Sequence, residues 1–328
     1  MRETLQQRCN LFIQNRDAIK AAFKWENTYI YPLCASIYSS RGIKVNADKM
    51  KACKGLLKDK TGVFSNFGGT GKMAAVTKLS LAANPEGQMD RMLSVYKDLK
   101  EVFWGSEFLA VTAAIITEMA EPGQYKRITK RTRTIYEHMK KAHPFLTGSE
   151  DSAFAALLAM SELDDIHITE DMERCYKILA PSFFSKDAVQ SLSHVLALGE
   201  DSPEHKCQKV MELFDYLKAQ GHKYGTNYEL STLGVLAMME VDVQTLAGDI
   251  MAVDDFLEGQ IGFGAFGIGA KQRRMYAGML TMCDYMPDAQ TIQAAALSGV
   301  VSLVVAQQAA LCASLAAASA ASSSNASN

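Results

Sequence analysis

A glycine-rich stretch followed by three cations is the part of this 328-residue sequence best suited to binding an anion. It spans Gly262–Arg274 and reads GFGAFGIGAKQRR. Gly267 and Gly269 let the backbone approach a ligand, and the N–H groups at the start of the following helix favour an anion. The cations in the first turn of that helix are Lys271, Arg273 and Arg274. The pattern predicts a site for a small anionic ligand, and the alternative is a flexible turn between helices.

Two carboxylates and a histidine are further candidates for chemistry. Asp254 stands at a helix position where earlier parts of the chain carry an aromatic residue, and Asp255 follows it. A carboxylate at a core position is costly unless it is paired or exposed, and paired carboxylates can also transfer protons. His194 lies on a helix of small and apolar residues, where a packing role competes with that of a general base. An enzyme or receptor requires these residues to converge with the three cations in one pocket.

The known catalytic signatures and the charge balance exclude several classes. The sequence contains no GxSxG, no HExxH, no Cys/His zinc spacing and no Rossmann fingerprint, so we expect no metal and no cofactor. The formal net charge is −2, whereas a nucleic-acid binder normally carries a basic excess. We therefore expect no nucleic-acid partner.

A second set of polar and aromatic residues lies where helices are expected to begin. These residues are Trp104, Glu107, Glu150, Asp151, Tyr228 and Glu229. In a regular array, helix starts of the same kind line one edge, and aromatic rings beside carboxylates suit a peptide or a cationic group. The alternative is helix capping and packing between repeats. This set predicts a surface that binds a protein or peptide partner.

The elements that position these residues come from a repeat of about 40 residues. Met92, Val95, Tyr96 and Leu99 follow the i, i+3, i+4, i+7 spacing of one helix face. The same spacing returns as Thr132/Ile135/Tyr136/Met139, Met172/Cys175/Tyr176/Leu179 and Val210/Leu213/Phe214/Leu217. An Ala- and Leu-rich helix precedes each of these segments, and no stretch alternates in the manner of a strand. The repeat predicts an all-α fold of αα-hairpins.

Stacked hairpins of this length suit an open HEAT-like solenoid, with a closed α/α toroid as the alternative. We expect residues 1–328 to form a single helical-repeat domain, because each hairpin packs on the next and needs no separate core. Its parts are a cap helix at 1–22, repeats at 23–288, an apolar helix at 289–320 and a disordered tail at 321–328. No charged residue follows Asp288, so the apolar helix is expected either to pack on the last hairpins or to associate with a membrane.

The compartment follows from the cysteines and the N-terminus. Seven cysteines are scattered and form no CxxC pair, which is typical of reduced thiols. The first residues are charged and lack an apolar signal core. These features predict a cytoplasmic location.

Four segments carry a resemblance to a known family. They are FLTGSEDSAFAALL at 145–158, QSLSHVLALG at 190–199, YGTNYELSTLGVL at 224–236 and FGIGAKQRRMYAG at 266–278. Their amino-acid sequences resemble those of an uncharacterised bacterial family, catalogued as the domain of unknown function numbered four thousand and three. The resemblance covers almost the whole chain and implies a bacterial, cytoplasmic protein. It brings no activity, cofactor or catalytic residue.

The repeat and the missing signatures together favour a non-enzymatic scaffold that binds a protein or peptide. An enzyme or receptor for a small anion at the glycine-rich turn is one alternative. A membrane-associated protein that uses the apolar C-terminal helix is another.

Overall fold

The protein is all-helical in the part of the chain that the computed structural model describes, residues 1–26, 28–62, 65–68, 71–264 and 267–286. Within these residues there are fourteen α-helices, one 3-10 helix and no strand. A single isolated bridge joins Phe263 to Ile268 in parallel. The predicted all-α class is confirmed. The expected apolar helix at 289–320 and tail at 321–328 lie outside the described residues.

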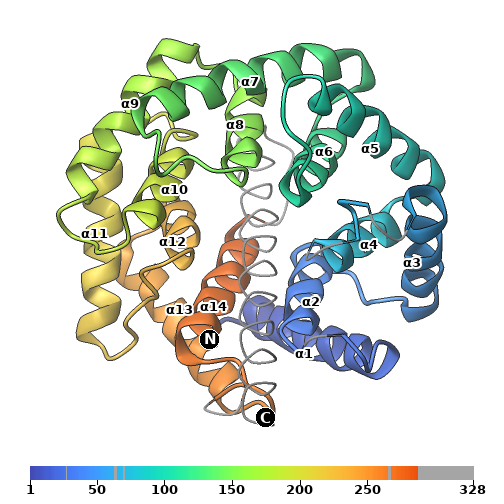
Figure 1. Cartoon of the computed structure of the whole chain (residues 1–328). Helices are drawn as coiled ribbons and strands as arrows, with labels where there is room; N and C mark the ends of the chain where they lie inside the picture. The colour runs from blue at the N-terminus through green and yellow to red at the C-terminus, as the bar shows by residue number, and fades with distance from the viewer. Residues whose placement is uncertain (27, 63–64, 69–70, 265–266, 287–328) are drawn as a thin grey trace, which may run out of the picture.

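The helices form consecutive hairpins, each with an outer and an inner member (Figure 1). The outer helices are α1 (Glu3–Ala22), α3 (Ala47–Thr61), α5 (Pro85–Lys100), α7 (Tyr125–Ala142), α9 (Asp165–Leu179), α11 (Pro203–Ala219) and α13 (Val243–Glu258). The inner helices are α2 (Ile30–Ser40), α4 (Lys72–Leu81), α6 (Glu107–Met119), α8 (Asp151–Met160), α10 (Lys186–Leu196), α12 (Glu229–Ala237) and α14 (Ala270–Tyr285). The 3-10 helix η1 (Pro122–Gln124) precedes α7.

The composition of the two kinds of helix explains which one lies inside. Outer helices bury one stripe, as α5 does with Met89, Met92, Val95 and Leu99. Inner helices are buried on nearly every side: nine of the ten residues of α8 and all nine of α12 are buried. A helix with one apolar stripe can face solvent with its other side, whereas a helix buried all round needs cover in every direction.

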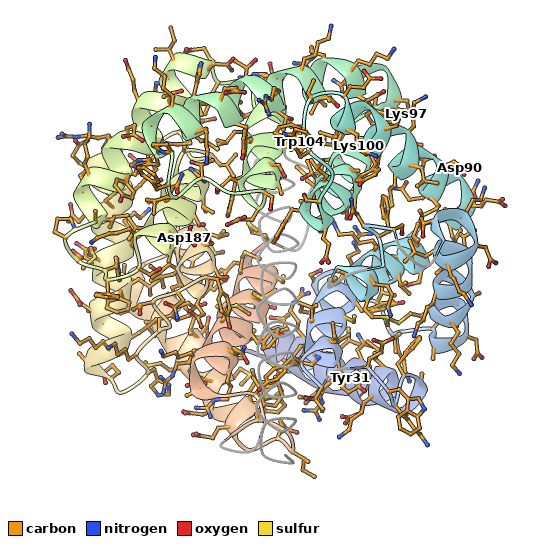
Figure 2. All side chains as sticks on the ribbon, viewed as in Figure 1. Tyr31, Asp90, Lys97, Lys100, Trp104 and Asp187 are labelled. Atoms are coloured by element: carbon orange, nitrogen blue, oxygen red, sulfur yellow. The ribbon has the colours of Figure 1, made fainter. Side chains whose placement is uncertain are left out.

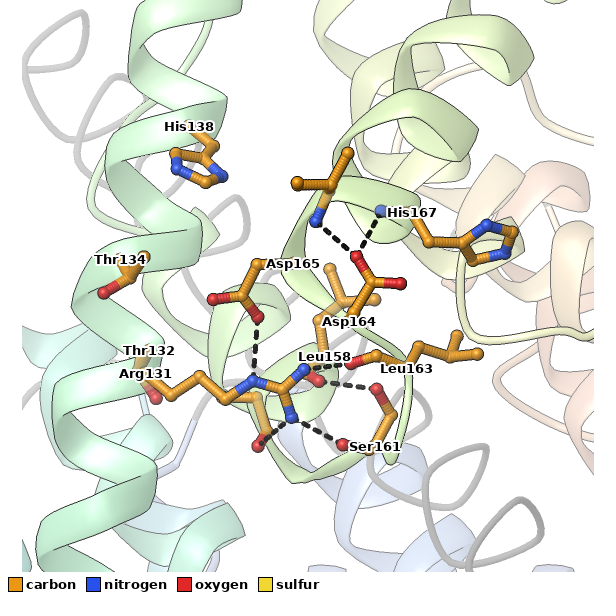
Figure 3. A network of polar contacts seen from close by, with 12 residues as sticks. Arg131, Thr132, Thr134, His138, Leu158, Ser161, Leu163, Asp164, Asp165 and His167 are labelled. Atoms are coloured by element: carbon orange, nitrogen blue, oxygen red, sulfur yellow. Dashed lines mark hydrogen bonds and ion pairs between the residues drawn. The ribbon is translucent and has the colours of Figure 1, made fainter.

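Polar residues define where the outer helices begin. The side chains of Asn84 and Ser202 accept hydrogen bonds from backbone N–H groups at the starts of α5 and α11. Each is followed by a proline at the first helical position, where the missing N–H costs nothing. Asp164 caps α9 in the same manner (Figure 3).

The basic residue Arg131 holds the connection between α8 and α9 in place (Figure 3). Its guanidinium donates to the carbonyls of Ala159 at 3.1 Å and Ser161 at 2.6 Å, and also to the carbonyl of Leu163. Its Nε lies 2.9 Å from the Asp165 carboxylate. The planar fork of arginine suits several acceptors at once. This cation therefore stabilises a turn.

The ends of the described array meet. α14 packs against both α1 and α2, so the helices complete a ring (Figure 1). The Phe12 ring lies 5.7 Å from the ring of Tyr276 and 6.2 Å from that of Phe263. The Arg2 guanidinium lies 3.0 Å from the buried carboxylate of Asp284. An open solenoid would leave these surfaces apart.

Two sequence expectations are corrected by this contact. The open HEAT-like array was our first expectation, and the contacts of α14 with α1 and α2 favour the closed alternative instead. The helix at 1–22 was expected to cap an exposed end. It is instead the outer helix of the first hairpin, because it packs along α2 and also touches α14. The repeat spacing described neighbouring hairpins and carried no information on the angle between them.

Candidate functional site

Large apolar side chains are exposed along one edge of the ring. The two helices of a hairpin are antiparallel, so connections from outer to inner helices lie at one edge and the reverse connections at the other. Five apolar residues in the outer-to-inner connections are between 88% and 100% exposed. They are Trp25, Trp104, Phe145, Phe184 and Ile261, and we call them the apolar edge. Trp104 is labelled in Figure 2.

The exposure of these residues follows from the packing of their neighbours. Phe103 meets the Tyr136 ring edge-on at 5.1 Å, and Phe183 meets the Phe214 ring at 5.2 Å. Each of these docked rings belongs to the repeat, and the residue that follows it, Trp104 or Phe184, remains outside. Single exposed apolar side chains are normal on a protein surface, whereas a contiguous apolar patch marks a binding surface. Trp104, Phe145 and Phe184 lie in three successive outer-to-inner connections.

Three carboxylates gather where α8 and α10 begin. They belong to Glu150, Asp151 and Asp187, and we call them the acid cluster. One Asp151 oxygen accepts a hydrogen bond from the Gly148 N–H at 2.8 Å. The Glu150 carboxylate folds over the same glycine, because a Cβ added there would lie 2.5 Å from one of its oxygens. Asp187 is exposed, so the cluster opens to solvent (Figure 2).

Burial and mutual repulsion perturb two of these acids. Burial raises the pKa of the Glu150 carboxyl, and the charges of Asp151 and Asp187 raise it further. Partial burial and the charge of Asp151 likewise raise the pKa of Asp187, against a lowering contribution from His194. The cluster therefore favours any ligand that supplies positive charge.

His194 and Gln190 extend the cluster into the protein. His194 is 2% exposed, and its Nδ1 lies 3.4 Å from an Asp151 oxygen without meeting hydrogen-bond geometry. Its ring also meets Phe154 edge-on at 5.4 Å. Gln190 donates from Nε2 to the Thr147 hydroxyl at 2.8 Å, while its Oε1 has no hydrogen-bond partner among the described residues. Two residues predicted for separate sites, His194 and Asp151, thus lie together.

The remaining residues of the predicted partner-binding set lie at other inner-helix starts on the same edge. Glu107 stands in the first turn of α6, after the cap Ser106. The Tyr228 hydroxyl accepts a hydrogen bond from Gln272 at 2.9 Å. Glu229 is buried, and its carboxylate accepts from the Asn227 N–H at 3.0 Å. Glu229 therefore has a local structural partner, unlike the exposed Asp187.

The residues proposed to converge around Asp254 do not form an open site. Asp254 is fully buried and pairs with Arg273 at 2.5 Å, with Arg274 at 3.1 Å and with His222 at 2.8 Å. Burial alone would raise the pKa of this carboxyl, but the hydrogen bonds from Arg273 and His222 lower it below its ordinary value. The network joins α13, α14 and the connection before α12. Glu258 pairs with Arg273 at 2.7 Å, so two carboxylates balance the two arginines and the group is an ion network that is mostly internal.

The other members of that predicted set point elsewhere. Asp255 is 68% exposed, and its carboxylate lies 3.8 Å from the His222 Nε2. Lys271 is exposed. His194 belongs to the acid cluster, on α10. Sequence reasoning placed these groups together because Asp254, Asp255 and the three cations all lie between residues 254 and 274, but successive helix residues face different directions.

The glycine-rich turn does line a pocket, with different cations from those predicted. The pocket has a volume of about 360 Å³ and is bounded by Gly262, Gly267 and residues of α1 and α2. Arg16 and Lys20 of α1 line it, and Lys271, Arg273, Arg274 and Gly269 do not. Arg16 donates to the Ile261 carbonyl at 2.9 Å and lies over the Phe263 ring. Sequence reasoning missed these two cations because ring closure brings residues 16 and 262 together.

No metal centre is formed by the described side chains. Within this part of the chain, no group of three or more His, Cys, Asp and Glu residues is placed to hold an ion.

Comparison with known proteins gives a family and no activity. The model of the family described as "Protein of unknown function (DUF4003)" matches residues 15–309. The chain belongs to this family. The resemblance drawn from the four sequence segments is thereby confirmed. The matched span contains the acid cluster and all five residues of the apolar edge.

A bacterial relative supports the same grouping. The uncharacterized protein YeaA of Bacillus subtilis (strain 168) is similar to this chain, with 22% identity over 301 residues. The match covers 89% of this chain and 89% of that protein. No solved structure matches.

Proposed function

We propose that this DUF4003 member is a non-enzymatic scaffold that binds a protein or peptide partner along its apolar edge. We infer a closed α/α toroid, rather than a HEAT-like solenoid, as the framework that presents this edge. The observation that carries the proposal is the exposure of Trp25, Trp104, Phe145 and Phe184 in equivalent connections. Large aromatic side chains are the residues that contribute most to binding when a partner covers them.

The acids beside the apolar edge suggest what the partner carries. Glu150 and Asp187 stand next to the connections that hold Phe145 and Phe184. A segment with apolar side chains and basic side chains would complement both. Burying the exposed rings would supply the affinity, and the charges would select the partner.

Selection from a phage-displayed library of random peptides tests the proposal. We expect enrichment of peptides that combine aromatic or aliphatic residues with Lys or Arg. Calorimetry should then show that the variant with Trp25, Trp104, Phe145 and Phe184 replaced by Ser loses binding at least tenfold, about 1.4 kcal/mol or more. The matched control replaces Ile43 and Ile166, which are 42% and 69% exposed near the opposite connections, by Ser. The proposal would be contradicted if the selection enriched no peptide, or if both variants bound the selected peptides equally.

A receptor or enzyme for a small anionic ligand is the second candidate, supported by the pocket beside the glycine-rich turn. Arg16 and Lys20 line this pocket together with Phe263 and Tyr31, which suits an anion with an aromatic group, although Asp17 also lines it and pairs with Arg16 at 2.7 Å. Phenyl phosphate should raise the midpoint temperature of thermal unfolding of the protein. Lys20→Gln should abolish that rise, whereas Lys24→Gln, an exposed lysine outside the pocket, should keep it. An unchanged midpoint in the parent protein would exclude this candidate.

We also propose a cytoplasmic location, supported by the cysteines. Cys9, Cys34, Cys53, Cys175, Cys207 and Cys283 are all buried thiols. Burial raises the pKa of several, that of Cys9 to about 12, so these groups resist oxidation. Membrane association through residues 289–320 remains a proposal, because those residues lie outside the described part. In the described part no helix combines the length and the apolar character needed to cross a bilayer.

A further inference from the structure

We propose that the acid cluster, extended by Gln190 and His194, is a binding site for an organic cation that ends in a guanidinium or ammonium group. The inference rests on the proposed function, because it names the side chain that a bound segment would insert. Its test uses small cations, so it can fail while the binding of a partner along the apolar edge stands.

No lysine or arginine among the described residues compensates the charge of the site, and its one ion-pair contact within these residues is that of His194 with Asp151 at 3.4 Å. None of Glu150, Asp151 and Asp187 forms an ion pair with a lysine or arginine in this part of the chain. Lys186, next to Asp187, donates instead to the carbonyls of Ala180 and Phe183. Arg133 pairs with Glu137 and lies over the rings of Phe103 and Tyr136.

Two buried polar atoms on α10 lack a hydrogen-bond partner among the described residues. They are Oε1 of Gln190, which is 1% exposed, and Nδ1 of His194. His194 Nδ1 faces the cluster, since an Asp151 oxygen is 3.4 Å away. An unpaired buried polar group is costly, and most such groups in proteins find a partner.

The polar residues of the site on α10 run from the surface into the protein. Asp187, Gln190 and His194 are spaced i, i+3 and i+7, so they share one face of the helix. The rise of the helix spreads them over about 10 Å, with the charged end at the surface. The donors of an arginine or lysine side chain lie only at its tip, so such a ligand would contact the carboxylate end of this face, at Asp187, and its aliphatic stem would donate to none of the other acceptors. The aliphatic stem of the ligand would pass the exposed rings of Phe145 and Phe184. A cation is also attracted to the face of an aromatic ring.

Isothermal titration with N-acetyl-arginine amide tests the inference on the full chain. We expect saturable binding that weakens with salt, and no binding of N-acetyl-citrulline amide, which has nearly the same shape without the charge. Asp187→Asn should weaken binding about tenfold, because a hydrogen bond between charged groups is lost. Asp187 is exposed, so this variant keeps the fold. Asp48→Asn, which removes an exposed acid from the start of α3, should bind as the parent does.

The outcomes separate this inference from the proposed function. Absent binding of the arginine probe, equal binding of the citrulline probe, or unchanged binding in Asp187→Asn would overturn the cation site. If the probe binds as expected while the peptide library yields no ligand, the cation site stands and the proposed function fails.

Discussion

At the scale of single residues, ionisable groups that look alike in the sequence have opposite roles. Asp254 is buried and held by two arginines and a histidine, so its charge is fully compensated. Asp187 is exposed, repelled by Asp151 and unpaired with a lysine or arginine among the described residues. A compensated carboxylate stabilises the fold, whereas an uncompensated one costs stability and is available to a ligand.

Asp254→Asn should therefore destabilise the protein by about 3 kcal/mol at neutral pH, because Arg273 keeps its buried charge without this partner. Asp255→Asn, the matched exposed neighbour, should change stability by less than about 0.5 kcal/mol. The folded-state pKa of Asp254 lies below its ordinary value of 3.8. Its contribution is thus present above that value and is lost as pH falls through the lower folded pKa. Urea unfolding of both variants at pH 7 and below pH 4 checks this, and equal losses at pH 7 would contradict it.

At the scale of elements, the inner helices approach one another closely where glycine permits it. A Cβ at Gly278 of α14 would lie 2.7 Å from the Tyr224 hydroxyl and 2.8 Å from a Leu236 methyl. A Cβ at Gly234 of α12 would lie 2.5 Å from a Leu192 methyl. Glycine is a poor helix former, so these two residues lower the stability of their own helices. In return, the absence of a Cβ allows the helices of the ring to pack closely.

Gly278→Ala should lower stability by about 1–3 kcal/mol through overpacking, although alanine favours a helix. Gly248→Ala on the outer helix α13 is the matched control, because nothing lies within 4 Å of its added Cβ. That variant should gain up to about 1 kcal/mol from helix propensity. Thermal and urea unfolding measure both changes. Stabilisation by both alanines would show that α14 does not approach its neighbours in this way.

At the scale of the whole molecule, closure of the ring connects the first hairpin to the last. Phe12 contacts Tyr276 and Phe263, while Arg2 and Tyr285 both reach Asp249, at 3.0 and 2.7 Å. In an open array, a change in the first hairpin affects mainly its sequence neighbours, since each repeat contacts only the next. In a ring the same change also reaches the last hairpin.

Phe12→Ala should cost about 3–5 kcal/mol, because it leaves a cavity between α1 and α14. Hydrogen exchange should accelerate in α13 and α14 as well as in α1 and α2. Ile168→Ala in α9 serves as the control. In this variant, hydrogen exchange in α13 and α14 should not accelerate more than in the other helices. Acceleration confined to α1, α2 and their neighbour α3 would contradict the closed arrangement.

The sequence alone was sufficient for the all-α class, whereas the repeat architecture and the edge of the candidate site stay predictions. The i, i+3, i+4, i+7 spacing of residues such as Met92 and Val95 depends only on local helix geometry, which is the same in every helix. Helix-start residues such as Glu150 are likewise recognised locally, because capping and first-turn charges act within a few positions. Trp104, which the same local reasoning placed near a helix start, is 95% exposed in the connection before α6.

The tertiary structure decided closure, and it also decided the partners of buried charges such as Asp151 and Asp254. Closure depends on a small rotation between successive hairpins that accumulates around the ring, and no short window of sequence encodes its sum. Arg16 meets the glycine-rich turn only because the ring closes. His194 meets Asp151 across two inner helices, and His222 meets Asp254 over a separation of 32 residues. Periodicity places a residue on a helix face, and only packing determines what that face touches.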